Sequence, residues 1–523
     1  MNSTEDYVAP PPTLLSRNPF VLLKYFGAGA FLASITIGSG ELLFPSRLGA
    51  MFGFQLLWMF PLVAVLKWAM SYSSARHFVL SGAHPLERWN EIPGPRGWLP
   101  LFFFSIFISC APFLASFMAS LLGNISSFIF PRFDLYIWAS VWILVCFVLL
   151  VIGSYDFIER AQLLILSVMV VCVIVAVAYA RPDWLGVLQG SLVPQMPEYP
   201  AWVLDKYEGF RSRSLWLELG VAAAVTGGGS HDYLCYVALL REKTWGRSQL
   251  GIADKPELER IAADVNHPAR KWIKAARIDS TLSMILVVVI ALCFAILASV
   301  VLEPQHLVPE KDHELLIHQA EFLTRLSPWL LPIYKLAVFL AFFGSVYGGP
   351  ELVSRVSNEF FRSVPGDRWK FSPKAIRWFA MIWTLCGSLA VLWVKRAFPD
   401  TRIVDFVTFP VIYTGIVLCG VYCFVNPWAD YKFLPTELRM HPILALLNIA
   451  AGLIYFWLGF QAIWGVTWEQ PFGWNIIVRP HLVILPIWIM GTMAAAHCLF
   501  PKQSNHGSAG VRTAKSKSKS DSS

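Results

Sequence analysis

Two short clusters of polar and ionisable residues interrupt apolar stretches of the sequence and are its best candidates for chemistry. The segment 36–41 reads T-I-G-S-G-E, and the segment 225–232 reads V-T-G-G-G-S-H-D. Carboxylate oxygens and imidazole nitrogens bind divalent metal ions, and ionisable side chains at membrane depth mark ion and solute pathways. We therefore predict one binding site from the two segments, and no catalytic residues. The predicted site, which could hold an ion or a solute, comprises Gly38, Ser39, Glu41, Thr226, Gly229, Ser230, His231 and Asp232.

The glycines in both clusters predict breaks in the surrounding helices. Glycine is a poor helix former, and a break within a membrane frees carbonyl and N–H groups that can hold an ion or a solute. A second interpretation stays open, because most of these polar residues are also good helix caps. Glu41 and Asp232 could match the charge of the helix that follows, Ser39 and Ser230 could cap it, and His231 could be a satisfied interior histidine.

The elements that must position these residues are membrane-spanning helices. Of the 523 residues, 56% are hydrophobic and 15% are charged, whereas a soluble domain is about 25% charged. This composition excludes a soluble globule, a disordered chain and a disulfide scaffold. The nine cysteines have no spacing typical of zinc sites or disulfides. The sequence contains no nucleophile-elbow, HExxH or phosphate-loop motif, so we expect neither an enzyme nor a bound cofactor.

A helix that crosses a bilayer needs about 20 apolar residues, and twelve stretches of the chain qualify. They are 20–46, 53–72, 99–123, 134–153, 158–180, 214–241, 280–302, 329–349, 377–394, 404–425, 441–461 and 480–500. With the N-terminus inside, the inner loops and tails hold 28 Lys and Arg, and the outer loops hold 11. We therefore expect a multi-pass protein of the cell membrane with both termini in the cytoplasm. The net charge of +8 then reflects the loops, and we expect no nucleic-acid partner.

The two glycine-rich spans are the first and the sixth, so they lie five helices apart. That spacing is typical of two inverted five-helix repeats with a binding site between them. The expected divisions of the chain are a cytoplasmic N-terminal tail (1–19), a first repeat (20–180), a second repeat (181–425), two further spans (426–500) and a disordered basic C-terminal tail (501–523).

Three other features give weaker predictions. The run Gly348-Gly349-Pro350, followed by Glu351, predicts a third break, in span eight. Lys335 is expected to extend toward the outer membrane interface. The outer loop 303–328 is acidic and contains three histidines, so it could attract cations. We prefer a solvated amphipathic helix there, because the loop lacks the spacing of metal ligands.

Three segments carry a resemblance to the Nramp family of divalent metal transporters, which have the leucine-transporter fold. They are L-G-A-M-F-G-F-Q-L-L-W at 48–58, G-S-H-D-Y-L-C-Y-V-A-L-L at 229–240 and A-R-I-D at 276–279. The resemblance covers most of spans one to ten. It implies an all-helical transporter that works by alternating access around broken spans one and six.

The chain departs from the family at the metal-binding positions. The family's Asp-Pro-Gly-Asn motif corresponds to residues 38–41, so Gly38 replaces its Asp and Glu41 its Asn. Gly229 and Ser230 replace the Met and Pro of its Met-Pro-His motif. The acidic residues of the family's third span, implicated in proton movement, fall on Cys110, Phe117 and Ser120.

These replacements change what the resemblance implies about the substrate. Losing a soft thioether ligand shifts the site toward hard or several divalent ions, with Mg, Mn or Fe as candidates. The metal ligands expected from the resemblance are Glu41, Asp232 and His231. Without carboxylates in span three, we expect weak or absent proton coupling. A transporter of a small organic solute, such as an amino acid or an organic cation, is the alternative on the same fold.

Overall fold

The structure of the chain is a computed structural model. It describes residues 7–37, 40–152, 155–211, 213–308, 320, 324, 328–364, 370–398, 403–466, 468–469 and 477–500. The basic C-terminal tail, most of the acidic loop 303–328, and Gly38 and Ser39 lie outside these residues. The predictions made for those segments therefore have no structural counterpart here.

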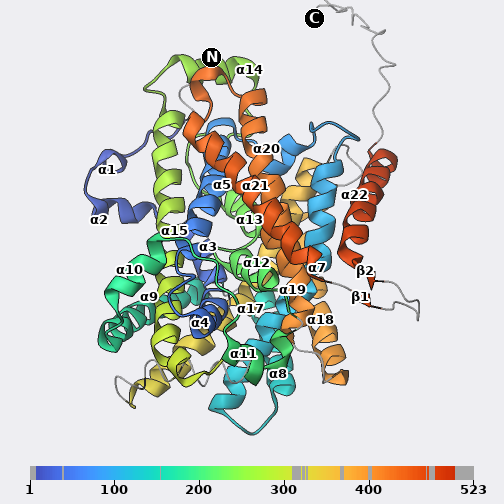
Figure 1. Ribbon diagram of the computed structural model, residues 1–523. Coiled ribbons are helices and arrows are strands. Elements are labelled where there is room, and N and C mark those ends of the chain that lie inside the picture. The colour runs from blue at the N-terminus through green and yellow to red at the C-terminus, as the bar shows by residue number, and fades with distance from the viewer. Residues whose placement is uncertain are drawn as a thin grey trace, which may run out of the picture.

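The described chain is almost entirely helical (Figure 1). Each of the twelve predicted spans falls on one long helix or on a series of consecutive helices. The long elements are α3 (Ala28–Thr36), α4 (Gly40–Phe52), α5 (Met59–Ser81), α7 (Trp98–Ile129), α8 (Leu135–Ile152), α9 (Tyr155–Ala180), α12 (Leu215–Val225), α13 (Ser230–Leu240), α15 (Pro268–Val301), α17 (Leu330–Ser363), α18 (Pro373–Ala397), α19 (Ile403–Ile412), α20 (Leu418–Phe433), α21 (Pro442–Trp464) and α22 (Pro480–Leu499).

Short elements connect the long helices. They are α1 (Pro12–Leu15), α2 (Pro19–Leu22), η1 (Leu23–Tyr25), α6 (Pro85–Trp89), α10 (Trp184–Leu192), α11 (Ala201–Lys206), η2 (Glu208–Phe210), α14 (Lys255–Ala263), η3 (Glu303–Gln305), η6 (Thr436–Leu438) and the π-helical turn η5 (Tyr413–Val417) between α19 and α20. The strands β1 (Trp468–Glu469) and β2 (Ile477–Val478) pair antiparallel before α22.

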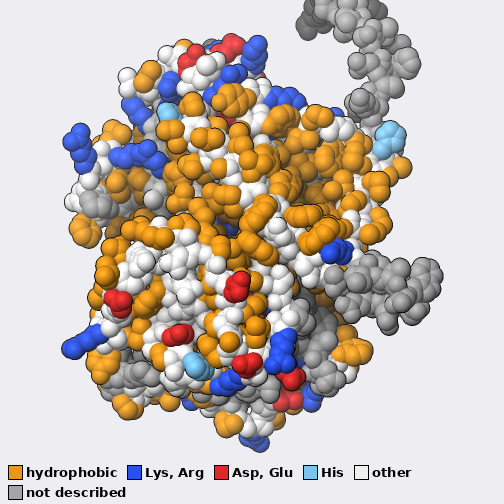
Figure 2. All heavy atoms as spheres, viewed as in Figure 1, with side chains coloured by type: hydrophobic (Ala, Val, Ile, Leu, Met, Phe, Trp, Pro, Cys, Tyr) orange, Lys and Arg blue, Asp and Glu red, His pale blue; other side chains and the backbone are white. Residues whose placement is uncertain are grey.

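Hydrophobic side chains cover much of the visible surface, and charged residues gather toward its two ends (Figure 2). Leu144, Leu446 and Trp457 are among the large apolar residues that are at least half exposed. Within the described residues, eight helices are long and apolar enough to cross a membrane, or up to ten if two bent helix pairs each count as one span. A surface this apolar is suited to lipid, while the number twelve stays a prediction.

Contacts between loops follow the predicted alternation of sides. At the predicted inner end, the hydroxyl of Tyr7 donates to Glu257 Oε1 at 2.6 Å, which joins the N-terminal segment to α14. Lys432 Nζ lies 3.2 Å from Glu91 Oε2 and joins the end of α20 to the α6–α7 connection. In Figure 1 the N-terminus, α14 and the end of α20 accordingly lie toward one end of the molecule.

The predicted outer loops contact one another in the same way. Lys206 Nζ donates to the carbonyl oxygen of His306 at 3.0 Å, between the end of α11 and the segment after η3. Arg396 Nη2 lies 3.0 Å from Asp134 Oδ2, between the end of α18 and the start of α8. The loops therefore sort into two groups as the sequence predicts, although the contacts do not say which group faces the cytoplasm.

Both predicted breaks fall between helical pieces. The axes of α3 and α4 differ by 48°. In span six, α12 ends at Val225 and α13 begins at Ser230. A Cβ atom at Gly40 would lie 2.8 Å from the carbonyl oxygen of Val225. Only glycine therefore permits this close approach of the second half of span one to the break in span six.

The third predicted break is wrong. Helix α17 runs from Leu330 to Ser363 without interruption through Gly348, Gly349 and Pro350. A proline removes one helix hydrogen bond and crowds the preceding turn, but neighbouring helices in a bundle can hold such a helix together. Glu351, instead of starting a new half-helix, forms an ion pair with Arg355, one turn later, at 3.1 Å.

Candidate functional site

Side chains from three helices take up the backbone groups that the break in span six releases. Gly227 and Gly228 have φ angles of +76° and +84°, a region that glycine adopts without steric cost. Glu41 Oε1 accepts a hydrogen bond from the amide of Gly227 at 2.8 Å, and the hydroxyl of Tyr233 donates to the carbonyl of Gly227. Asp232 Oδ2 accepts from the amide of Gly229 at 2.6 Å.

Lys67 is a residue of this site that sequence reasoning missed. It lies in α5, is fully buried, and donates from Nζ to the carbonyl oxygen of Ala224 at 2.7 Å and to that of Gly228. The expectation of free carbonyls at the break is therefore wrong at these two positions and at Gly227. A lone lysine within an apolar span was the available indication, because charged residues at membrane depth are usually functional.

Glu41 occupies a different place from the one expected of a principal ligand. It is fully buried at the start of α4. Its Oε1 atom is bound to Gly227, and its Oε2 atom has no hydrogen-bond partner among the described residues. Its carboxylate supports the backbone of the break, which leaves one buried oxygen to accept another donor.

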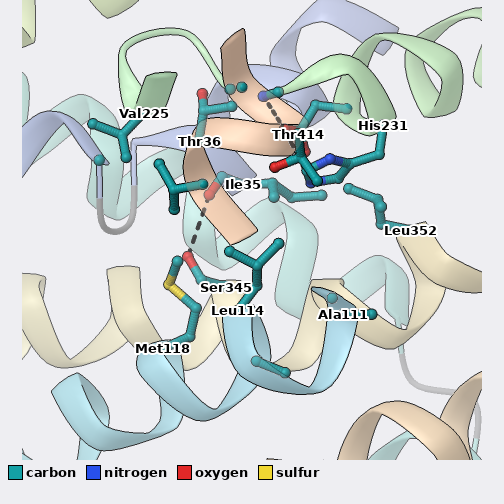
Figure 3. A pocket seen from close by; sticks show the side chains of 18 of the residues that line it. Ile35, Thr36, Ala111, Leu114, Met118, Val225, His231, Ser345, Leu352 and Thr414 are labelled. Carbon is teal, nitrogen blue, oxygen red and sulfur yellow. Dashed lines mark hydrogen bonds and ion pairs between the residues drawn. The ribbon is translucent and has the colours of Figure 1, made fainter. Parts of the chain in front are cut away.

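A cavity of about 130 Å³ lies beside the break (Figure 3). It is bounded by both halves of spans one and six and by α7, α17, α18, α19 and η5. Its space accommodates several water molecules, at about 10–15 Å³ for each by this measure. Most of its wall is apolar, and its two ionisable side chains, His231 and Asp232, both belong to span six. The lining includes Ile35, Thr36, Phe107, Ala111, Leu114, Met118, Val225, Gly228, Gly229, His231, Asp232, Ser345, Leu352 and Thr414.

His231 and Asp232 form the ionisable part of the cavity wall. His231 Nε2 lies 3.4 Å from Asp232 Oδ2, and the imidazole stacks on Phe107 with ring centroids 5.0 Å apart. Its Nδ1 atom is buried and has no hydrogen-bond partner in the described part of the chain. Figure 3 shows His231 beside Thr414 on one side of the cavity, with Ala111, Leu114 and Met118 of α7 on another. A polar solute in the cavity therefore meets an imidazole and a carboxylate together.

The predicted site residues separate into three groups. Gly229, His231 and Asp232 line the cavity. Glu41, Thr226 and Ser230 lie at the two breaks but are not among the described lining residues. Gly38 and Ser39 lie outside the described residues. Within the described chain, no three His, Cys, Asp or Glu side chains come together as a metal site would require, so the three ligands remain predictions.

Two of these residues act as caps in the structure. Asp232 is the third residue of α13 and accepts from the amide of Gly229, the residue before the helix. The hydroxyl of Thr226, at the end of α12, donates to the carbonyl of Ala222 at 2.8 Å. Asp232 therefore satisfies both interpretations left open by the sequence, because one carboxylate caps the half-helix and also faces the cavity.

The three positions of span three that the resemblance singled out are buried along α7. They are Cys110, Phe117 and Ser120, and the hydroxyl of Ser120 donates to the carbonyl of Phe117 at 2.8 Å. A hydroxyl bound within its own helix adds no charge to the cavity, and neither do the other two side chains.

A buried ion triad joins α4 and α12, the predicted outer halves of the broken spans. Glu218, in the first turn of α12, accepts from Arg47 Nη2 of α4 at 3.1 Å and forms an ion pair with Arg213 Nε. At most 9% of each residue is exposed. Buried charges such as these are costly unless each has a partner of opposite sign. The outer halves are therefore held together by one carboxylate between two guanidinium groups.

Carboxylate contacts also hold α3 and α13, the predicted inner halves, but in two separate places. Asp279, the last residue of the A-R-I-D segment, accepts from the amides of Gly27 and Gly29 at 2.8 Å each, which fixes the start of α3 to α15. Arg241, at the end of α13, binds both carboxylate oxygens of Glu359 in α17, at 2.6 and 2.9 Å. It also reaches Glu87 at 3.3 Å.

Comparison with known proteins places this geometry in a family. The family model described as "natural resistance-associated macrophage protein-like" (Nramp) matches residues 29–465. No curated protein sequence matches the chain significantly. The structure is similar to a manganese transporter of Eremococcus coleocola in complex with an aromatic bis-isothiourea compound, with a TM-score of 0.62, 12% identity, and coverage of 94% of this chain and 95% of that one.

A second structure of the Eremococcus coleocola transporter, a single-residue variant, has a TM-score of 0.61 at 13% identity, covering 92% of this chain and 94% of that one. At such low identity the likeness concerns the fold, and it extends over nearly the whole of both chains. With the family model covering spans one to eleven, the chain belongs to the Nramp family and is a multi-pass integral membrane protein with the leucine-transporter fold.

Proposed function

We propose that this protein is an alternating-access transporter that carries a divalent cation through the cavity beside the break in span six. The observation that carries the proposal is the pairing of His231 and Asp232 on the cavity wall, at the break around which such transporters rock. Family membership supports the class of substrate, since the Eremococcus coleocola relative is described as a manganese transporter.

The cation is held with part of its water shell. One carboxylate and one imidazole face the cavity. Among the described residues, no cluster of three His, Cys, Asp or Glu side chains could replace all the water around the cation. Magnesium and other hard ions keep several waters and are often bound through one or two carboxylates. The cavity's volume of about 130 Å³ leaves room for those waters. Selectivity is therefore broad or shifted toward hard ions, and transport does not need a proton gradient.

Uptake into proteoliposomes tests this function. We expect entry of Mn²⁺ and Mg²⁺ at rates that a pH gradient does not change. Asp232→Asn keeps an oxygen that can cap α13 but removes the charge, and should lower uptake by about tenfold, the effect of losing about 1.4 kcal/mol of binding. Glu259→Gln, which alters an exposed carboxylate on α14, is the matched control. Absence of divalent uptake, or equal uptake by Asp232→Asn, would contradict the proposal.

The apolar wall of the cavity favours one alternative, a small organic solute. Ile35, Leu114, Met118 and Leu352 could contact a hydrocarbon part, while Asp232 binds an amine. Thermal unfolding with a panel of amino acids, organic amines and divalent ions separates the two functions. Stabilisation by an organic compound, together with no response to Mn²⁺ or Mg²⁺, would favour the alternative.

We place the end of the molecule that carries the N-terminus and α14 in the cytoplasm of the cell, because that end holds the basic loops. A reporter domain that is active only inside the cell should be active when it is fused to the N-terminus, and a reporter that is active only outside the cell should be inactive there. Activity of an extracellular reporter at the same position would reverse the orientation.

A further inference from the structure

The most unusual side chain outside the cavity wall is the buried lysine of span two. Lys67 is the ninth residue of α5, and it is fully buried with apolar neighbours such as Leu66 and Met70. Moving an ammonium group out of water costs several kcal/mol, even after the protein relaxes. Such a group persists only where strong acceptors surround it, so the acceptors of Lys67 define a cation site.

Those acceptors are backbone carbonyls made available by the break in span six. Ala224 lies in the last turn of α12, where carbonyls have no partner within the helix and carry the negative end of its dipole. Gly228 lies in the connecting segment, where its positive φ directs the backbone away from a helical path. Lys67 Nζ donates to both carbonyl oxygens. Helix ends and unwound carbonyls of this kind coordinate sodium or a proton carrier in other transporters.

The charges around this point complete the cation site. Glu41 and Asp232 both interact electrostatically with Lys67. Each carboxylate also accepts a hydrogen bond from an amide of the same segment, Gly227 for Glu41 and Gly229 for Asp232. Charged side chains from α4, α5 and α13 therefore hold three consecutive glycines, and the ammonium offsets part of the negative charge.

We propose that Lys67 is a tethered cation that permanently occupies the cation site of the broken sixth span, so that no free monovalent cation binds there. In the transport cycle, which rests on the proposed function, the solute enters the neighbouring cavity without a coupling sodium or potassium ion at this site. Lys67 is thus a positioning residue that acts through the backbone of residues 224–228.

Replacing the tether should recreate a site for a free cation. Lys67→Met keeps the length and apolar stem of the side chain but leaves the two carbonyls without their donor. In N-methylglucamine chloride the purified variant should unfold about 5 °C or more below the wild type. Ammonium or sodium chloride at equal ionic strength should restore at least half of the loss, because under the proposal a free cation takes the place of the Lys67 ammonium at the two carbonyl oxygens.

A second lysine within a helix provides the matched control. Lys335 of α17 donates to a single carbonyl, that of Phe128, at 3.3 Å and lies over its ring. Lys335→Met should show no selective response to ammonium or sodium. The wild type should unfold at the same temperature in all three salts, and this measurement decides the matter if Lys67→Met does not yield folded protein.

Two results would overturn the proposal. One is a wild-type protein that sodium or potassium stabilises selectively, which would mean that a free cation still binds. The other is a Lys67→Met variant that is as stable as the wild type, or that no small cation restores. Because unfolding requires no transport, failure of divalent uptake with successful rescue would reject the proposed function and leave the tethered cation intact.

Discussion

The predicted outer and inner halves of the broken spans are held by different arrangements of charge. At the outer end, Glu218 is shared by Arg47 and Arg213, and all three are buried. At the inner end, the contacts are divided between Asp279, which caps α3, and Arg241, which has two carboxylate partners. The outer contacts therefore depend on one residue, whereas the inner contacts can break at one half-helix at a time.

This difference indicates how the halves of the broken spans can move. A triad around a single buried carboxylate is either intact or broken, because removing one partner exposes the others to a large desolvation cost. The contacts of Asp279 with α3 and of Arg241 at the end of α13 are separate, so each half-helix can move without breaking the contact of the other. We therefore expect opening toward the inner end to be gradual and opening toward the outer end to be abrupt.

The largest expected effect is at the outer triad. Glu218→Gln leaves Arg47 and Arg213 buried without their carboxylate and should lower the free energy of unfolding by about 3 kcal/mol. Its inner counterpart, Glu359→Gln, should cost about half as much, since Arg241 keeps Glu87 as a partner. Denaturant unfolding of the two variants in detergent measures both losses, and equal losses would contradict the comparison.

A moderate effect is expected where span one begins. Asp279→Asn removes the charge from a group that accepts two amide hydrogen bonds at the start of α3, which should cost about 1–2 kcal/mol. Hydrogen exchange should become faster in α3 and stay unchanged in α4. Ser280→Ala, at the neighbouring position of α15, is the control. Faster exchange in both α3 and α4 would mean that the contacts of the inner halves are not separate from those of the outer halves.

Acid should weaken the inner end selectively. Burial lowers the pKa of His84, which faces Glu359, Arg241 and Glu87. Its Nε2 atom contacts the carbonyl of Leu234 at 3.1 Å and its Nδ1 accepts from the amide of Leu86, so the neutral ring fits this site.

For a histidine with a lowered pKa, the stabilisation is complete above the unfolded value of about 6.5 and is lost as the pH falls below it. The unfolding temperature should therefore drop between pH 7.5 and 5.5, and the drop should shrink in His84→Gln. His441→Gln changes an exposed histidine that also caps a helix and should leave the drop unchanged. An equal drop in the unfolding temperature of the wild type, His84→Gln and His441→Gln would show that His84 does not cause the acid sensitivity.

The smallest effect is expected at the rim of the inner end. Glu242 forms an ion pair with Arg355, but its side chain is 61% exposed. Exposed ion pairs contribute about 0–1 kcal/mol, so Glu242→Gln should change the unfolding temperature little. A loss as large as that of Glu359→Gln would show that exposure does not separate the two pairs.

Much of this fold follows from apolar length and glycine position. Each of the twelve apolar stretches overlaps one helix or a series of helices, because a bilayer span needs about 20 apolar residues, although only eight to ten spans are apparent in the described chain. The break before Ser230 coincides with Gly227 and Gly228 because both take a positive φ. The same reasoning failed at Pro350, where packing in the bundle keeps α17 continuous. Local sequence therefore indicates where a helix can break, and tertiary contacts decide whether it does.

The site was less predictable than the fold. His231 and Asp232 were found because they are ionisable and adjacent to glycines. Lys67 was missed because its partners are backbone carbonyls 157 and 161 residues away, which no spacing in the sequence reveals. Glu41 was expected to face a metal, yet its Oε1 atom supports the amide of Gly227. The direction in which a buried carboxylate points depends on packing between helices, and residue type alone does not specify it.

The measurement that tests the central claim most directly is an experimental structure of the protein with Mn²⁺, located by its anomalous scattering. We predict a single peak in the cavity beside Asp232 and His231, with Lys67 still bonded to the carbonyls of Ala224 and Gly228. A peak between those two carbonyls with Lys67 displaced, or no peak in the cavity at a saturating concentration of Mn²⁺, would contradict the account.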